Sequence, residues 1–444
     1  MLLGAFPAWW VLGLGVLGFL LATVPMVAWL ARLRRVATPP GTGWWLMFLL
    51  WAAAGALVLG ADAPGTQPTT PAEQAVGYVF RLAWYVAATV VLLYVGNQSR
   101  DGYLSDVRLQ RLLASLFLVT VAGGYIGFLL PDLAFRSPVE RLLPSGLPGA
   151  EFLGKLAHPA VAQQMDIGVD VTRPSAPYVY ANDWGAMYGL LLPWFVVAWT
   201  APGAGWRRHW FLPVLAISFP PAVFSLNRGL WLGLAAVALF LGVRAALQGR
   251  FAAVAALGGA AVATGSALVL TPLGALVGTR LDNQHSNSGR TELAVRSVSA
   301  VLEGSPLLGF GSTRDVQGNF FSIAGGDSAA CIGCSTPQLG TQGHLWLLLF
   351  AHGLVGTLLF VLFLLRRALP LLRDSGGPGT AALASVLFFL AVSPFYDLAM
   401  LPLFVLMAVL GMAWRAEDPV EVANPLSRTV PTDAPWPRRE VARE

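Results

Sequence analysis

The chain has 444 residues, of which 56% are hydrophobic and only 11% are charged. Soluble globular domains carry about 25% charged residues, so this composition excludes an ordinary soluble enzyme and indicates an integral membrane protein surrounded by lipid. The formal net charge of +5 gives no reason to expect a nucleic-acid partner, because the basic residues are scattered between hydrophobic stretches.

The first apolar run covers residues 6–30 and is followed by Arg32, Arg34 and Arg35. A cleavable signal peptide has a shorter apolar segment and ends in a small-residue cleavage site. We therefore expect this run to be the first membrane helix.

Ten more apolar runs follow, and a membrane-spanning helix needs about 20 such residues. Because hydrocarbon cannot satisfy free backbone groups, the runs must be helical. The sequence therefore predicts an all-α, polytopic bundle over residues 1–415. The expected spans are 6–30, 44–61, 74–95, 112–130, 182–199, 210–226, 229–243, 251–277, 344–365, 380–398 and 400–415.

The placement of arginine predicts the orientation of this bundle. Arginines occur in alternate short connections, namely 31–43, 97–111, 200–209, 244–250 and 366–378. The short connections at 62–73 and near 399 contain no Lys or Arg. Since Lys and Arg concentrate in cytoplasmic loops, the N-terminus is expected outside and the C-terminus inside the membrane.

Two connections on the expected outer side are unusually long, at 131–181 and 278–343. Loops beyond about 12–15 residues are usually functional or disordered, so we expect the functional residues to lie in or next to these two loops. The segment 416–444 is rich in Pro and charge without periodicity, and it is expected to be a disordered cytoplasmic tail.

Arg228 lies where two apolar spans reverse direction, between Asn227 and Gly229. One interpretation is an anchor whose charge reaches the membrane surface. The other is a functional site, because the connection is too short to lift the side chain into water and arginine in a membrane segment is functional by default.

Arg290 is expected to open a short amphipathic helix, with Ser288 or Gly289 as its N-cap and Gly304 near its end. A guanidinium beside free helix N–H groups suits a phosphate, although a solvated surface arginine is equally compatible with the pattern. Arg280 in the same loop strengthens the case for an anionic ligand.

His344 begins a span at the outer boundary. Its imidazole could accept a proton from a hydroxyl, or it could be a hydrogen-bonded residue at a helix start. In the first outer loop, Arg173 precedes Asn182 and Asp183, and we expect these three to extend the binding surface. The alternative for Asp183 is simple stabilisation of a helix N-terminus.

Cys331 and Cys334 are the two cysteines of the chain, and both fall in the second outer loop. Two thiols without a nearby His or further Cys make a weak zinc site, so no metal is expected. On the oxidising side of the membrane, a structural disulfide is the better interpretation.

Several motifs resemble those of the O-antigen ligase and O-antigen polymerase superfamily of bacterial membrane glycosyltransferases. The resemblance covers roughly residues 173–365. It rests on Ser225-Leu-Asn-Arg-Gly-Leu-Trp-Leu-Gly233, on Arg280-Leu followed by Ser288-Gly-Arg290-Thr-Glu-Leu, on Ser305-Pro-Leu-Leu-Gly-Phe-Gly311, and on Gly353-Leu-Val-Gly356.

The resemblance implies a glycosyltransferase of the C type with an extracytoplasmic active site and no metal or other cofactor. Its donor would be a polyprenyl-diphosphate-linked glycan, and its acceptor a hydroxyl of a glycan or lipid. Arg228 and Arg290 would bind the donor diphosphate, and a histidine at the start of the following span would serve the acceptor. Counting back from Gly353, that position falls nearer Gln342 than His344, so both residues are candidates.

The motifs leave ligase and polymerase open, because the two differ only in the acceptor. The competing class is a transporter or flippase of a lipid-linked or anionic envelope precursor. Such a protein would need ionisable groups at mid-membrane depth, typically in broken helices. The charged residues of the apolar runs lie near their ends, which favours the glycosyltransferase.

Overall fold

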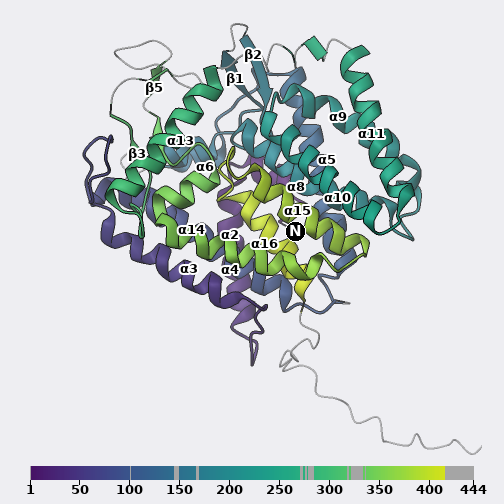
Figure 1. Cartoon of the computed structure of the whole chain (residues 1–444), viewed down its shortest axis with the longest axis horizontal. Coiled ribbons are helices and arrows are strands. Elements are labelled where there is room, and N and C mark those ends of the chain that lie inside the picture. The colour runs from purple at the N-terminus through teal and green to yellow at the C-terminus, as the bar shows by residue number, and fades with distance from the viewer. Residues whose placement is uncertain are drawn as a thin grey trace, which may run out of the picture.

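The computed structural model describes residues 2–100, 102–144, 150–166, 170–270, 274–275, 278, 285–317, 320–321, 334–335 and 337–415. These residues form a mostly helical protein with three small two-stranded sheets (Figure 1). Four of the described helices, α4, α5, α10 and α14, are long and apolar enough to cross a membrane. Residues 416–444, expected to be a disordered tail, lie outside the described part of the chain.

The helices in the first half of the chain are α1 (Phe6–Val11), α2 (Leu17–Leu30), α3 (Thr42–Ala54), the 3₁₀ helix η1 (Gly55–Val58), α4 (Pro71–Gly96), α5 (Asp106–Leu129), α6 (Pro138–Leu142), α7 (Ala150–Ala157), α8 (Ala181–Thr200) and α9 (Trp206–Phe224). Those in the second half are α10 (Arg228–Leu247), α11 (Phe251–Leu270), α13 (His285–Gly304), α14 (His344–Leu371), α15 (Gly377–Val392) and α16 (Leu401–Trp414). The strands are β1 (Ala162–Asp166), β2 (Asp170–Pro174), β3 (Arg314–Asp315), β4 (Phe320–Phe321), β5 (Cys334–Ser335) and β6 (Gln338–Leu339).

The apolar core of the bundle is centred on α16. Every residue from Leu401 to Met412 is buried, and the helix packs against α4, α8 and α15. A helix that is hydrophobic on all sides is stable only when it is enclosed, and that is the position α16 takes. It begins directly after the turn 393–400, which joins it to α15.

At the other extreme, α11 lies at the edge of the molecule and packs against α10 (Figure 1). Its large apolar side chains are exposed, with Val269 83% and Leu270 81% accessible. On the neighbouring α10, Leu239 is 70% accessible. Exposed apolar surface of this extent on adjacent helices is expected for a lipid-facing surface.

The expected first span, 6–30, is not one helix. The chain leaves the helical conformation after α1 and resumes it at Leu17. Gly13 has φ +85°, a left-handed conformation that glycine adopts without strain and that a continuous helix does not contain. Hydropathy alone could not reveal this break, since the residues on both sides of it are apolar.

The expected helix start at Arg290 is also wrong, because α13 begins five residues earlier, at His285. The residues at 286–288 are Ser, Asn and Ser, which favour caps but cost only a few tenths of a kcal/mol in a helix interior. They therefore continue the helix here. Arg290 consequently lies in the second turn of α13 and not at its N-terminus.

The longest helix, α14, is interrupted at Gly353, which has φ 64° and ψ −169°. This region of backbone conformation is essentially restricted to glycine. An interrupted helix leaves carbonyl and N–H groups without their usual partners, which is costly away from water. The segment 305–311 supplies the missing partners.

Three backbone hydrogen bonds join this segment to the break: Phe310 N to Phe350 O at 2.9 Å, Gly311 N to Ala351 O at 2.9 Å, and Leu354 N to Pro306 O at 2.9 Å. The two glycine-rich motifs therefore pack backbone to backbone. Their glycines have a structural explanation that does not require contact with a substrate.

Candidate functional site

The turn 393–400, between α15 and α16, is hydrogen-bonded to the start of α14. His344 N donates to Tyr396 O at 2.6 Å, and Leu345 N donates to Ser393 O at 3.0 Å. The first N–H groups of a helix have no partner within it, so these contacts fix where α14 begins. The indole of Trp346 adds a bond to Pro394 O at 2.9 Å.

The same turn fixes the start of α10. The phenol oxygen of Tyr396 accepts a hydrogen bond from Leu230 N at 2.9 Å. The backbone of Gly229 lies so close to this ring that a Cβ there would meet Tyr396 at 2.6 Å. Arg228 is the first residue of α10, so by fixing the start of this helix Tyr396 also fixes the position of the Arg228 side chain.

Arg228 and Arg290 converge on this turn from different parts of the chain. Arg290 Nη1 donates to Phe395 O at 2.8 Å, and the charge of Arg290 acts on Arg228. Both guanidinium groups also interact electrostatically with Tyr396. Each residue is partly exposed, so together they form a basic surface that an anionic ligand can contact.

Burial lowers the pKa of Arg290, and the neighbouring Tyr396 partly opposes this effect. An arginine remains protonated in spite of such a shift. The lowered pKa therefore indicates a guanidinium that has lost part of its hydration, and its charge acts more strongly on a nearby anion than one in open water would.

Arg173 lies under the α9–α10 turn. It is buried, and its Nε donates to Ser225 O at 2.7 Å while Nη2 donates to Asn182 Oδ1 at 3.1 Å. The side chain of Asn227 is buried too and donates to Ala181 O at 3.2 Å. These contacts clamp the turn that carries Arg228 onto the start of α8, so Arg173 and Asn182 act here as supports for the turn.

Substituting lysine for Arg173 is expected to lower the free energy of unfolding by about 1–3 kcal/mol, because buried acceptors lose a two-pronged donor. Thermal unfolding in detergent measures this loss. Arg141→Lys is the matched control, since Arg141 is an exposed arginine of the same outer loop. Equal melting temperatures for the two variants would contradict the clamping role.

His344 and Asp397 lie on another part of the turn. His344 is fully buried, and neither of its ring nitrogens has a hydrogen-bond partner. Its Nδ1 lies 3.7 Å from Asp397 Oδ1, just beyond hydrogen-bond distance, and the Asp397 side chain is 43% exposed. Asp183 at the start of α8 interacts electrostatically with Asp397. Carboxylates and an imidazole therefore gather beside the basic surface.

Gln342 is placed differently from His344. Its Nε2 donates to Gln338 O at 3.0 Å and to Thr341 Oγ1 at 3.1 Å, within its own segment. Arg280 and Cys331 lie outside the described residues, and the side chain of Cys334 does as well. The expected disulfide and the expected role of Arg280 remain predictions.

Tyr396 and Asp397 were not among the expected site residues. The available signal was a tyrosine and an aspartate at the end of the expected span 380–398, directly before the short connection near 399. Within the described residues, no group of three or more His, Cys, Asp or Glu side chains is arranged to hold a metal ion.

A second polar cluster lies between α4, α14 and the segment 305–311. Tyr85 Oη is 3.2 Å from His352 Nε2, and one Nη of Arg81 is buried without a hydrogen-bond partner. Arg314 donates to four backbone carbonyls in the same region. Burial, together with the charge of Arg81, lowers the pKa of Arg314 to about 10.

Comparison of the chain with protein-family models, with curated proteins and with solved structures finds no match. The function is therefore argued from the chemistry of the site.

Proposed function

We propose that the protein is a membrane glycosyltransferase of the O-antigen ligase or polymerase type. It transfers a glycan from a polyprenyl diphosphate donor to an acceptor hydroxyl on the extracytoplasmic side of a bacterial plasma membrane. The reaction belongs to cell-surface polysaccharide biosynthesis. The acceptor, a lipid-linked glycan or a growing chain, decides between ligase and polymerase.

The observation that carries this proposal is the convergence of Arg228 and Arg290 on the turn 393–400. Breaking the bond between a sugar and a diphosphate develops negative charge on the leaving phosphate oxygen. Two partly desolvated guanidinium groups, one at the start of α10 and one in the second turn of α13, stabilise that charge better than solvated arginines do. They also hold it in position without reorganising during the reaction.

In the proposed reaction, the acceptor hydroxyl oxygen forms a bond to the anomeric carbon of the donor sugar. The bond from that carbon to the diphosphate oxygen breaks, and the diphosphate keeps the electron pair beside Arg228 and Arg290. The hydroxyl proton passes to the carboxylate of Asp397. The ring of His344 is fully buried and cannot contact an acceptor in water. It lies next to the Asp397 carboxylate, which it can stabilise and orient.

Substituting asparagine for Asp397 tests this proton transfer. The amide keeps the shape of the side chain but cannot accept the proton, so kcat is expected to fall about 10²–10⁴-fold while the KM for the donor changes little. Asp132→Asn, at an exposed carboxylate of the first outer loop, is the control and should retain activity. Unchanged kcat for Asp397→Asn would exclude the role.

The function itself is tested with purified protein and a polyprenyl-diphosphate-linked glycan, without ATP or a nucleotide sugar. The expected result is a glycosylated acceptor and one released polyprenyl diphosphate for each glycan transferred. Release without an acceptor product, or no consumption of the donor with any glycan or lipid acceptor, contradicts the proposal.

The transporter alternative is favoured by one observation, the second polar cluster. His352 adjoins the break in α14, and Arg81 interacts electrostatically with it in the interior of the bundle. Broken helices with interior ionisable groups are typical of transporters. Movement of the intact lipid-linked glycan across a vesicle membrane, without transfer, would identify that class.

A further inference from the structure

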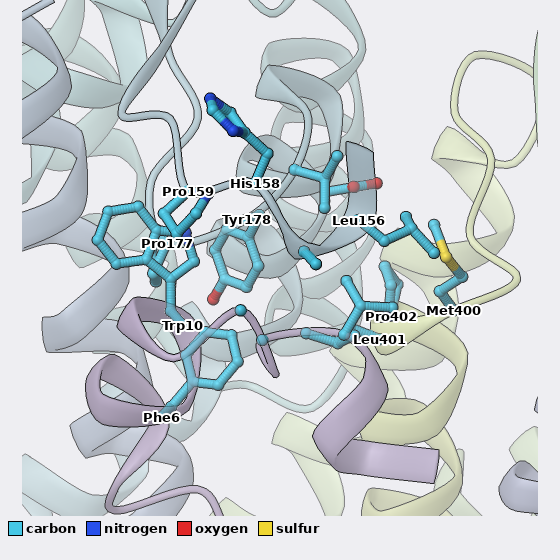
Figure 2. A pocket seen from close by; sticks show the side chains of 16 residues that line it. Phe6, Trp10, Leu156, His158, Pro159, Pro177, Tyr178, Met400, Leu401 and Pro402 are labelled. Carbon is cyan, nitrogen blue, oxygen red and sulfur yellow. The ribbon is translucent and has the colours of Figure 1, made fainter. Parts of the chain in front are cut away.

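A crevice that is partly open to solvent lies beside the carboxylates of the candidate site. It is formed by the joint between α1 and α2, the end of α7, the segment before α8 and the start of α16 (Figure 2). The enclosed space is about the size of one water molecule, so a larger ligand would contact the mouth of the crevice and not its interior. Asp183 lines this crevice and interacts with Asp397, so it adjoins the place where the acceptor must react.

One wall of the crevice is aromatic. Figure 2 shows Phe6, Trp10 and Tyr178 grouped on one side, with Leu401 and Pro402 across from them. Phe6 and Tyr178 are buried and pack together with ring centroids 5.6 Å apart. Trp10 is partly exposed, so it offers accessible indole surface to a ligand.

The charge of the lining selects among ligands. Among the described residues that line the crevice, Asp183 is the carboxylate, and none is a lysine or arginine. His158 is hydrogen-bonded to Glu140 at 2.9 Å. This lining disfavours a phosphate, which the arginines on the other part of the site attract. It favours a neutral ligand with hydroxyl groups, because a carboxyl oxygen accepts hydrogen bonds from hydroxyls in either protonation state.

The position of the crevice also distinguishes a sugar from a lipid chain. Its described lining comes from the short α1, from connecting segments, from the end of α7 and from the first residues of α8 and α16. A prenyl chain would need a groove along the length of a spanning helix. This lining stays at the helix ends, on the side where the orientation of the chain puts the extracytoplasmic surface.

We propose that the mouth of this crevice binds a neutral sugar ring of the acceptor. The apolar face of the ring packs on Trp10, and one of its hydroxyls donates to Asp183, which directs a second hydroxyl toward Asp397. The inference rests on the proposed function, because it assigns the acceptor end of that reaction. It divides the site into an anionic donor part at the arginines and a neutral acceptor part at the crevice.

Saturation-transfer NMR with the full chain, in a detergent that contains no sugar, measures the binding directly. The probes are the methyl glycosides of neutral sugars, namely glucose, galactose, rhamnose and N-acetylglucosamine. At least one of them is expected to receive saturation from the wild type and from Trp10→Phe, and to lose it with Trp10→Ala. The control is Trp206→Ala, because Trp206 is a 65% exposed tryptophan of α9 and should have no effect.

A second variant guards against misfolding of Trp10→Ala. Met400 is partly buried on the lining, and Met400→Trp fills the crevice without removing its aromatic wall. Both variants should raise the KM for the acceptor about 10-fold or more, which corresponds to about 1.4 kcal/mol of binding free energy. The KM for the donor should stay unchanged.

The outcomes separate the two proposals. Saturation that depends on Trp10, in a protein without transfer activity, supports the sugar site and contradicts the glycosyltransferase. Normal transfer with sugar binding and acceptor KM unaffected by either variant overturns the sugar site alone. Saturation of a prenyl alcohol probe in place of the glycosides, lost in Met400→Trp, also overturns it and identifies a lipid occupant.

Discussion

Replacing Arg228 or Arg290 with alanine is expected to abolish glycan transfer while the protein still inserts and folds. Removing one donor that stabilises a developing oxyanion typically reduces kcat about 10²–10³-fold, and each guanidinium carries a full charge. The loss should therefore be at least of this size for each variant. It is measured as the initial rate of product formation from a polyprenyl-diphosphate-linked glycan at saturating donor.

Lysine at either position restores the charge but not the planar, multi-donor geometry, so partial recovery is expected at most. Arg296→Ala is the matched control, because Arg296 lies on the same helix as Arg290 and forms an exposed ion pair with Glu292. Its activity should equal that of the wild type. Normal transfer by Arg228→Ala or by Arg290→Ala would refute the assigned donor site.

Alanine at Gly353 is expected to prevent stable folding. Its Cβ would lie 2.2 Å from Leu307 O and 2.8 Å from Gly309 N, both backbone atoms that cannot move aside independently. The φ of +64° is itself strained for any other residue, at about 1–3 kcal/mol. The segment 305–311 can then no longer dock on α14, and the three hydrogen bonds across the break are lost with it.

The yield of monodisperse protein on size-exclusion chromatography and its melting temperature in detergent report this loss. Gly259→Ala provides the comparison, because a Cβ at Gly259 of α11 meets nothing within 4 Å and alanine favours a helix. That variant should match or exceed the stability of the wild type. If Gly353→Ala melts at the wild-type temperature, the backbone packing described here is wrong.

The sequence predicts the existence of most helices, because long apolar runs have few alternatives in a lipid surrounding. It fails where helices break. Gly13 and Gly353 interrupt apolar runs without changing their hydropathy. A sliding-window hydropathy analysis therefore shows one continuous apolar segment around each of these glycines. The count of eleven spans stays a prediction, since only four described helices meet the length and hydropathy of a full span.

The candidate site was predictable in part. Arg228 and Arg290 stand out as charges in unusual sequence surroundings, and the resemblance gave each of them a role. Tyr396 could not be found in this way, because its bond to Leu230 joins residues 166 positions apart. The expected contact of Arg173 with substrate stays a prediction, and its hydrogen bonds to Ser225 and Asn182 give it a role in the fold as well. A local pattern does not distinguish an arginine that binds a ligand from one that supports a turn.

The interruption of α14 also bears on bilayer thickness. As a continuous helix, its 28 residues would extend about 42 Å, whereas membrane hydrocarbon is about 30 Å thick. The apolar part that ends before Arg366, residues 344–365, gives about 33 Å, which is close to that thickness. The break at Gly353 then lies about 14 Å from the start of the span, where water cannot replace the lost helix bonds and the segment 305–311 does so instead.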